Sequence, residues 1–392
     1  GRENLSLSGG FWYYGSKAMV FSIKKKITAL IFVGVFASVS FLNITKISRL
    51  FLFHQADAPS DTVDENGWST SASGTTFASA LSPDGNTAYF GGSITQAGPH
   101  FNAAALVSTS SGRPVQPLPR FNNQIGSIVR DGQGGWFVSG LFTKVADTGI
   151  KYLVHINSNG TLDTSWTPTP DNVVAVLLLS EDGATLYVGG IFTSIGGQPR
   201  TRLAALSAST GLATSWNTDG PNNSVSELAL SPDESILYAG GTFTAVGGAT
   251  RNRLAAFSTS TGALLSWDPN ASSFVSVILL NEAGDTLYVG GAFTTIGGES
   301  RNRIAALSTS TGLATSWDPN ASSTVNFVYL DSAGTTLYAG GAFATIGGQS
   351  RLGLAALSVS TGAASSWDPS ANTSVTSIIA NTDGTLLFVS GV

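Results

Sequence analysis

The chain has 392 residues, of which 46 are Gly, none is Cys and only 11% are charged, which suits one large, turn-rich β domain and excludes disulfides, thiolate metal ligands and a cysteine nucleophile. The hydrophobic share of 42% is sufficient for a buried core. The formal net charge is −5, and it becomes −10 when the first 58 residues are set aside, so no nucleic-acid partner is expected.

The residues before the first repeat carry an export pattern. Lys24–Lys26 precede the apolar run Ile27–Ile44, as in the charged and hydrophobic regions of a secretion signal. We interpret residues 19–58 as a signal peptide cleaved at Ala56–Ala58 or as an uncleaved membrane anchor, and a buried core helix is the remaining alternative. Export predicts a secreted or cell-surface-anchored protein that contacts the membrane only through this segment.

Two flanking stretches are not assigned to the folded domain. Residues 1–18 precede Met19, the only Met of the chain, and we interpret them as a non-native upstream extension. Residues 59–67 are polar and predict a linker. The domain itself is then expected to cover residues 68–392.

A repeat of about 50 residues is the strongest pattern in the sequence. Its first marker is a short apolar run that ends in Gly, found at residues 88–92, 136–140, 186–190, 237–241, 287–291, 337–341 and 387–391. Its second marker is a recurring tryptophan, at Trp68, Trp166, Trp216, Trp267, Trp317 and Trp367. Self-similarity of this length indicates one repeated supersecondary unit rather than several unrelated domains.

One unit, from Phe274 to Asn320, illustrates the expected strands. The residues predicted to form them are 274–280, 286–294, 303–308 and 314–317. Gly297-Gly298 begins a loop, and Pro319 ends the last strand because proline cannot donate to a sheet. Four short antiparallel strands in about 50 residues are typical of a propeller blade, so we predict an all-β fold, a β-propeller of four-stranded blades.

The spacing also predicts how the ring closes. Trp68 precedes Gly85 by the same 17 positions that separate Trp267 from Gly284, so residues 67–69 resemble a fourth strand that completes the last blade. This gives seven blades, preceded by the signal or anchor helix. The chain stops after the second strand of the last blade, so we interpret that blade as incomplete and the propeller as truncated at its C-terminus.

The repeated Trp and Gly residues have structural interpretations. A Trp where one blade meets the next buries about 150–250 Å² and contributes roughly 4 kcal/mol at most, so all six side chains are assigned to packing. Gly290-Gly291 and their equivalents are expected to let neighbouring backbones approach closely.

Recurring charged residues form the candidate binding set. They are Arg200, Arg202, Arg251, Arg253, Arg301, Arg303 and Arg351, together with Asp268, Asp318 and Asp368 in the turns before the next first strand. Residues two apart in a strand share a face, so both members of an Arg pair are expected on one side. Both loops lie on the same edge of the ring, which predicts an Arg–Asp tie between units. The alternative is an arginine-lined rim that binds an anionic glycan.

No metal site or cofactor is predicted. His54, His100 and His155 form no zinc-ligand pattern. Turns such as residues 82–85 follow hairpin chemistry and lack the dense carboxylates of a calcium loop. The N-x-S sequons at Asn270 and Asn320 fall on a repeated turn, which explains them without glycosylation.

Three stretches resemble known families. LYVGGAFTTIGGESRNRIAALSTSTGLATSWDPN (287–320) resembles the secreted bacterial β-propeller repeats of unknown function that are related to the delta-60 type. This resemblance extends over residues 68–392 and implies an exported propeller, usually part of a larger surface protein, without an assigned reaction. LSPDESILYAGG (230–241) is similar to the repeats of surface-layer and lactonase-like propellers. AALSTSTGLATSW (305–317) resembles the Trp-docking motif of pyrroloquinoline quinone dehydrogenases, although Ser308 stands where that motif has Asp.

Two classes of function follow. The first is an exported, non-catalytic module for binding, adhesion or scaffolding, whose partner is an unknown protein or glycan at the cell surface. The second is an extracellular hydrolase of polysaccharide or lactone with a carboxylate site in the propeller funnel, and a quinone-dependent dehydrogenase is a third alternative. The residues that suggest catalysis fall in the atypical second unit: Asp131, Lys144, Asp147, Lys151 and His155. No Ser-His-Asp order or nucleophile elbow is present.

Overall fold

The computed structural model describes residues 20–22, 72–73, 76–81, 87–92, 96–97, 104–108, 119–371, 374–380 and 386–391. Within these ranges the chain forms strands and turns and contains no helix. Accordingly, the described residues include no helix that is long and apolar enough to cross a membrane. Residues 1–18, residues 59–67 and Trp68 lie outside the described ranges, as does most of the expected export segment.

The described strands form seven three-stranded antiparallel sheets, and the three strands of every sheet except the last come from one continuous stretch of the chain. In order from first to third strand they are β3–β4–β6 (Thr76–Leu81, Thr87–Gly92, Ala104–Ser108), β7–β8–β9 (Ile125–Arg130, Trp136–Gly140, Leu153–Ile156), β10–β11–β14 (Val174–Leu179, Thr185–Gly190, Leu203–Ser207), β15–β16–β19 (Val225–Leu230, Ile236–Gly241, Leu254–Ser258), β20–β21–β24 (Val275–Leu280, Thr286–Gly291, Ile304–Ser308), β25–β26–β29 (Val325–Leu330, Thr336–Gly341, Leu354–Ser358) and β30–β31–β1 (Val375–Ala380, Leu386–Gly391, Val20–Ser22).

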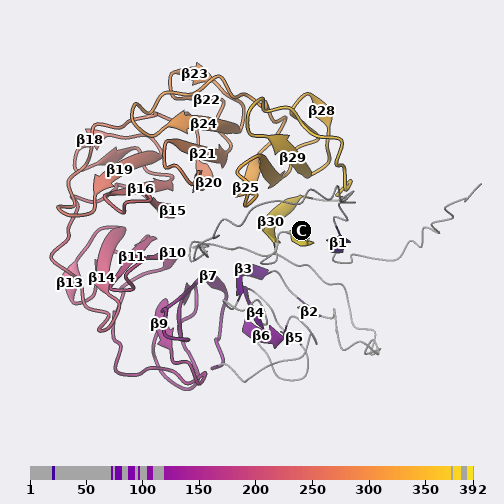
Figure 1. Cartoon of the computed structure of the whole chain (residues 1–392). Coiled ribbons are helices and arrows are strands. Elements are labelled where there is room, and N and C mark those ends of the chain that lie inside the picture. Colours follow the sequence, from indigo (N-terminus) through magenta and orange to yellow (C-terminus); the bar gives the residue numbers. More distant parts are fainter. Residues whose placement is uncertain are drawn as a thin grey trace, which may run out of the picture.

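The sheets follow one another around a common centre (Figure 1). The first strand of each sheet lies innermost and contacts the first strand of the next sheet, from β3 through β7, β10, β15, β20 and β25 to β30. The third strands lie farther out. A blade-like arrangement therefore places each sheet face to face with its neighbours.

The expected fourth strand is shorter than predicted. Residues 314–317 contribute a single bridge, between Leu307 and Ala314, and the same bridge recurs in neighbouring sheets. The segment ends at Trp317, whose ring packs into the seam with the next sheet, and at Pro319, which cannot extend the ladder. Each repeat whose fourth segment is described is thus a four-stranded antiparallel unit whose last strand is reduced to one pair.

A small hairpin replaces the loop that the Gly-Gly pair predicted. Strands β22 (Thr295–Ile296) and β23 (Glu299–Ser300) pair across Gly297-Gly298, whose φ angles of 61° and 82° suit a tight primed turn. The same hairpin recurs as β12–β13 (Ser194–Ile195, Gln198–Pro199), β17–β18 (Ala245–Val246, Ala249–Thr250) and β27–β28 (Thr345–Ile346, Gln349–Ser350), and β2 (Ala72–Ser73) pairs with β5 (Gln96–Ala97). These hairpins lie on the outer side of the ring (Figure 1).

The Gly pair inside the second strand allows the sheets to approach. A Cβ atom at Gly290 would lie 2.7 Å from Val277 Cγ1 on its own sheet and 3.0 Å from Val325 Cγ1 on the next sheet. Gly291 faces the carbonyl oxygen of Phe274 just as closely, beside a register shift at the start of β20. Any larger residue at either position would separate the strands or the sheets.

Five of the six clusters of buried hydrophobic residues in the described part of the chain join two neighbouring sheets. One cluster joins Tyr187 and Leu203 of the third sheet to Leu237, Phe243 and Phe257 of the fourth. A single repeat therefore cannot bury its own apolar faces, and each seam contributes its own part of the stability.

The last sheet incorporates residues from the N-terminal part of the chain. Val20–Ser22 form β1, antiparallel to β31, in the place that the third strand takes in the other sheets. From the sequence, these residues were predicted to belong to the export segment, and the last blade was predicted to lack its third strand. The predicted closing strand, residues 67–69, lies outside the described residues, so closure into seven blades and the preceding helix stay predictions.

Candidate functional site

The first arginine of each pair serves as a clamp within its own repeat. Arg251 donates from Nη1 to the carbonyl oxygen of Thr250 (2.8 Å) and from Nη2 to that of Leu265 (2.9 Å). The equivalent Nη2 acceptors are Thr214 for Arg200, Thr315 for Arg301 and Ser365 for Arg351. These clamp arginines (Arg200, Arg251, Arg301 and Arg351) tie the outer hairpin to the fourth segment, and their Nε atoms are buried.

The Arg–Asp ties differ from the expectation. Arg251 Nη1 lies 3.8 Å from Asp268 Oδ2, and Arg351 Nη1 lies 3.6 Å from Asp368 Oδ2. Each pair joins a hairpin to the connection that leaves the same sheet, so the tie lies within one repeat instead of between two. Asp318 makes no ion pair within residues 119–371. Because these aspartates are more than one third exposed, the pairs add little stability.

The second arginine of each pair does not share a strand face with the first. Arg202, Arg253 and Arg303 have φ angles of 62°, 68° and 66°, in the left-handed region. This conformation interrupts the alternation of side chains just before the third strand. Gly353, with φ of 68°, occupies the same place in the next sheet, which explains why Arg351 has no partner arginine there.

These rim arginines (Arg202, Arg253 and Arg303) keep most of their donors. Arg202 donates one bond to the carbonyl oxygen of Pro221 (3.1 Å), and Arg253 and Arg303 each donate one to the side chain of the preceding asparagine. All three are half-buried. Their remaining guanidinium N–H groups have no partner in the part of the chain that the structure describes, and they are not enclosed.

Four of the described tryptophans, each at the end of a fourth segment, join one sheet to the next. Trp267 packs edge-on against Tyr238 of its own sheet, with ring centroids 5.1 Å apart, and its Nε1–H donates to the carbonyl oxygen of Ser308 at the end of the next sheet (3.1 Å). The equivalent acceptors are Ala208 for Trp166, Ser258 for Trp216 and Ser358 for Trp317. Buried indoles with a satisfied N–H act as staples between repeats, and Trp367 is half-buried at the last described seam.

The second sheet holds a charged cluster that the sequence only partly indicated. His155 on β9 places Nε2 3.0 Å from Asp131 Oδ2 and Nδ1 3.0 Å from Asp163 Oδ2. Asp131 also accepts from the backbone N–H of Gly135, where any side chain would collide with its carboxylate and with the carbonyl oxygen of Ile156. Asp163 was not anticipated, because it lies in the fourth segment, where other repeats have Thr, Leu or Ser.

The geometry of this cluster makes it a structural element. A neutral imidazole has one N–H, so donation to both carboxylates requires a second proton on the ring. Burial opposes ionisation of Asp163, but hydrogen bonds from the Ser165 hydroxyl, His155 and the Ser165 backbone outweigh it and lower its pKa. Since both ring nitrogens are engaged by protein groups, His155 has no nitrogen left for a substrate.

The other residues that suggested catalysis lie apart from this cluster. Lys144, Asp147 and Lys151 are exposed on the loop between β8 and β9, at the opposite end of β8 from Asp131. The described residues also contain no group of three acidic, His or Cys side chains suited to a metal ion.

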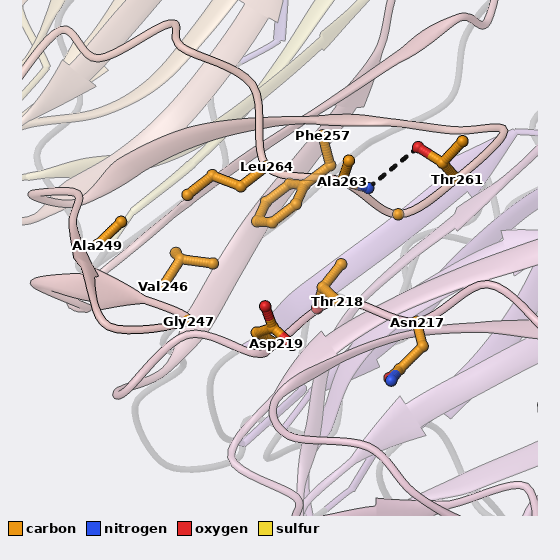
Figure 2. A pocket seen from close by; sticks show the side chains of 11 residues that line it. Asn217, Thr218, Asp219, Val246, Gly247, Ala249, Phe257, Thr261, Ala263 and Leu264 are labelled. Carbon is orange, nitrogen blue, oxygen red and sulfur yellow. Dashed lines mark hydrogen bonds between the residues drawn. The ribbon is translucent and has the colours of Figure 1, made fainter.

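A hollow of about 180 Å³ opens between the third and fourth sheets (Figure 2). It is lined by Asn217, Thr218, Asp219, Val246, Gly247, Ala249, Phe257, Thr261, Gly262, Ala263 and Leu264. The first three belong to the connection after Trp216, and the rest belong to the fourth sheet. None of the residues predicted from the sequence to form a site lines this hollow.

Comparisons with known proteins agree with the arrangement of sheets. The family model of a β-propeller domain of unknown function (DUF5122) matches residues 285–309, from β21 to the end of β24. The computationally designed Ika8 protein superposes with a TM-score of 0.52 at 13% identity, over 81% of this chain and 84% of that one. The chain is a β-propeller repeat protein. No curated protein matches this propeller in sequence, and the structural likeness extends to the fold alone.

Proposed function

We propose that the propeller is an exported, non-catalytic binding module whose contact residues are the rim arginines Arg202, Arg253 and Arg303. The proposal rests on the observation that the two arginines of a pair use their guanidinium N–H donors differently. Both Nη groups of each clamp arginine donate to backbone carbonyls, whereas each rim arginine donates only one hydrogen bond. Three consecutive sheets therefore repeat a half-exposed guanidinium at the same place.

The ligand that suits this arrangement is an acidic polysaccharide. A guanidinium binds carboxylate or sulfate groups through two parallel hydrogen bonds, and a polymer presents such groups at intervals that a repeated surface can follow. The residues after position 58 carry a net charge of −10, so the attraction must be local to the rim arginines. Binding is accordingly expected to weaken steeply with added salt.

The N-terminal pattern and the resemblance to secreted bacterial propeller repeats of the delta-60 type support the export part of the proposal. The charged and apolar residues between positions 19 and 58 would place the propeller outside the cytoplasm. Cell fractionation with N-terminal sequencing of the mature protein tests this part. Recovery of the full-length chain in the soluble cytoplasm would contradict it.

The binding test uses the full chain with polygalacturonate, dextran sulfate and neutral dextran as probes. The variant R202N/R253N/R303N removes the rim guanidinium groups, and Asn is chosen because it tolerates the left-handed backbone. The matched control R120N/K144N/K151N removes the same charge from exposed positions of the second repeat. We expect at least a tenfold loss of binding to an acidic probe in the rim variant, and less than a twofold loss in the control.

Three outcomes would overturn this proposal. The first is that the wild-type chain binds neither acidic probe. The second is that the control variant loses as much affinity as the rim variant. Release of oligosaccharide products from a probe, measured by reducing-end assay, would replace the binding module with a hydrolase.

A further inference from the structure

The connections between sheets close most seams in the same way. In three of them the carbonyl oxygen of a proline accepts a hydrogen bond from the first Gly of the next hairpin turn. These bonds are Gly196 N to Pro168 O (2.5 Å), Gly297 N to Pro269 O (2.6 Å) and Gly347 N to Pro319 O (2.6 Å). The connection therefore lies tightly against the outer hairpin of the next sheet.

The seam after Trp216 departs from this pattern. Val225 follows Trp216 by nine positions, whereas Val275 follows Trp267 by eight, so this connection is one residue longer. Thr218 stands where the other connections have proline, and Gly247 N instead reaches the carbonyl oxygen of Gly220 at 3.3 Å. The extra residue moves the connection away from the hairpin, and the 180 Å³ hollow lies at this seam.

The hollow has a polar mouth and an apolar floor. Asn217 and Asp219 are exposed on one side, and Thr261 is exposed on the other (Figure 2). Asp219 lies against the hairpin turn, because a Cβ atom at Gly247 would be 3.0 Å from its Oδ2. Val246 and Phe257 are fully buried and form the floor.

We propose that this seam binds one neutral or amino-bearing sugar residue. The volume corresponds to about six water molecules, which is the scale of a single sugar ring. Carboxylate, amide and hydroxyl groups at the mouth suit vicinal hydroxyls, and the apolar floor suits the C–H face of a ring. The Asp219 carboxylate favours an amino substituent and repels an acidic sugar, so this site is distinct from the rim arginines.

The repeat itself supplies a variant that fills the hollow without disturbing the fold. Ala263 lines the hollow, and the equivalent residues of neighbouring repeats are Leu212 and Leu313, which are accepted there. Ala263→Leu is therefore expected to fold normally and to occupy the space. Ala363→Leu is the matched control, because it makes the same change at a seam that Pro319 closes.

The experiment titrates the full chain with D-glucosamine, D-glucose and D-glucuronate and follows amide chemical shifts by NMR. We expect shifts centred on residues 217–219 and 261–264, with glucosamine binding more tightly than glucose and glucuronate not binding. Ala263→Leu should weaken glucosamine binding at least tenfold and Ala363→Leu less than twofold. Asp219→Asn should remove the preference for glucosamine over glucose.

Two results would overturn the assignment. One is that neither glucosamine nor glucose, at tens of millimolar, shifts the amide resonances of this seam. The other is an equal effect of the two Ala→Leu variants. Neither result bears on the rim arginines, whose acidic polymer probes and variants are separate.

Discussion

The second sheet and the fifth sheet build the same kind of seam with different chemistry. In the fifth sheet, Tyr288 pairs in register with Ala306, and Trp317 packs edge-on to the tyrosine. In the second sheet, Phe137 pairs with His155, whose imidazole ring stacks at 4.8 Å on the Phe137 ring. One repeat thus fills its seam with neutral side chains, whereas the other places a histidine between two carboxylates. Both sets of side chains are compatible with the fold, because the hydrogen bond from a Trp indole to the next sheet is present at both seams.

The largest expected effect tests the shared staple. Trp166→Ala and Trp267→Ala should each lower the free energy of unfolding by about 3–5 kcal/mol, because each removes a large buried ring and a hydrogen bond to the next sheet. Chemical denaturation of the full chain measures this loss. Leu313→Ala is the control, since that side chain is 59% exposed and should change stability by about 0.5 kcal/mol or less. A small effect at either Trp would show that the seams do not depend on the staples.

The next effect separates the two fillings. His155→Ala should cost about 2 kcal/mol, because it leaves the partly buried carboxylates of Asp131 and Asp163 facing each other without a shared donor. Adding Asp131→Asn and Asp163→Asn to His155→Ala should recover part of that loss. If the triple variant is less stable than His155→Ala alone, repulsion between the carboxylates is not the cause.

A smaller effect appears as pH dependence. The folded-state pKa of Asp163 lies below its ordinary value of 3.8, so its carboxylate stabilises the folded protein above that value. This contribution is lost as the pH falls from about 3.8 through the lower folded-state pKa. Thermal unfolding of wild type and Asp163→Asn between pH 6 and 2.5 should show the two converging at the acid end. The fifth sheet has Thr315 at this place, and Thr315→Val should give a difference from wild type that is independent of pH.

The smallest effect concerns the exposed ion pairs of the regular sheets. Asp268→Asn should change stability by less than about 0.5 kcal/mol, because its pair with Arg251 is 3.8 Å long and open to water. Arg251→Gln should cost clearly more, since it removes the bonds to two backbone carbonyls. Equal effects in urea denaturation would mean that the ion pair and not the carbonyl clamp holds the hairpin.

Periodicity alone predicted the all-β repeat and placed the first and third strands of the unit to within one residue, whereas the second strand ends at Gly291, three residues before the predicted end. It could not predict the left-handed backbone at Arg202, Arg253 and Arg303, because arginine carries no sign of that conformation; Gly353 at the same place was the available signal. The contact between His155 and Asp163 was not predicted, because Asp163 and Asp131 come together only when the fourth segment folds back on the turn between β7 and β8. The hollow had a sequence signal, the extra residue between Trp216 and Val225, but its meaning depends on the tight seams beside it.

The staples have a consequence for how such a chain changes over generations. Trp166, Trp216, Trp267 and Trp317 each find an acceptor in the following repeat, and the acceptor is always a backbone carbonyl. Recombination between near-identical coding units that adds or removes one whole period leaves every Trp facing a suitable acceptor. An exchange that adds or removes only part of a period leaves an indole exposed to water and uncovers the apolar face beneath it. Selection on this gene is therefore expected to tolerate changes in copy number far better than changes in period.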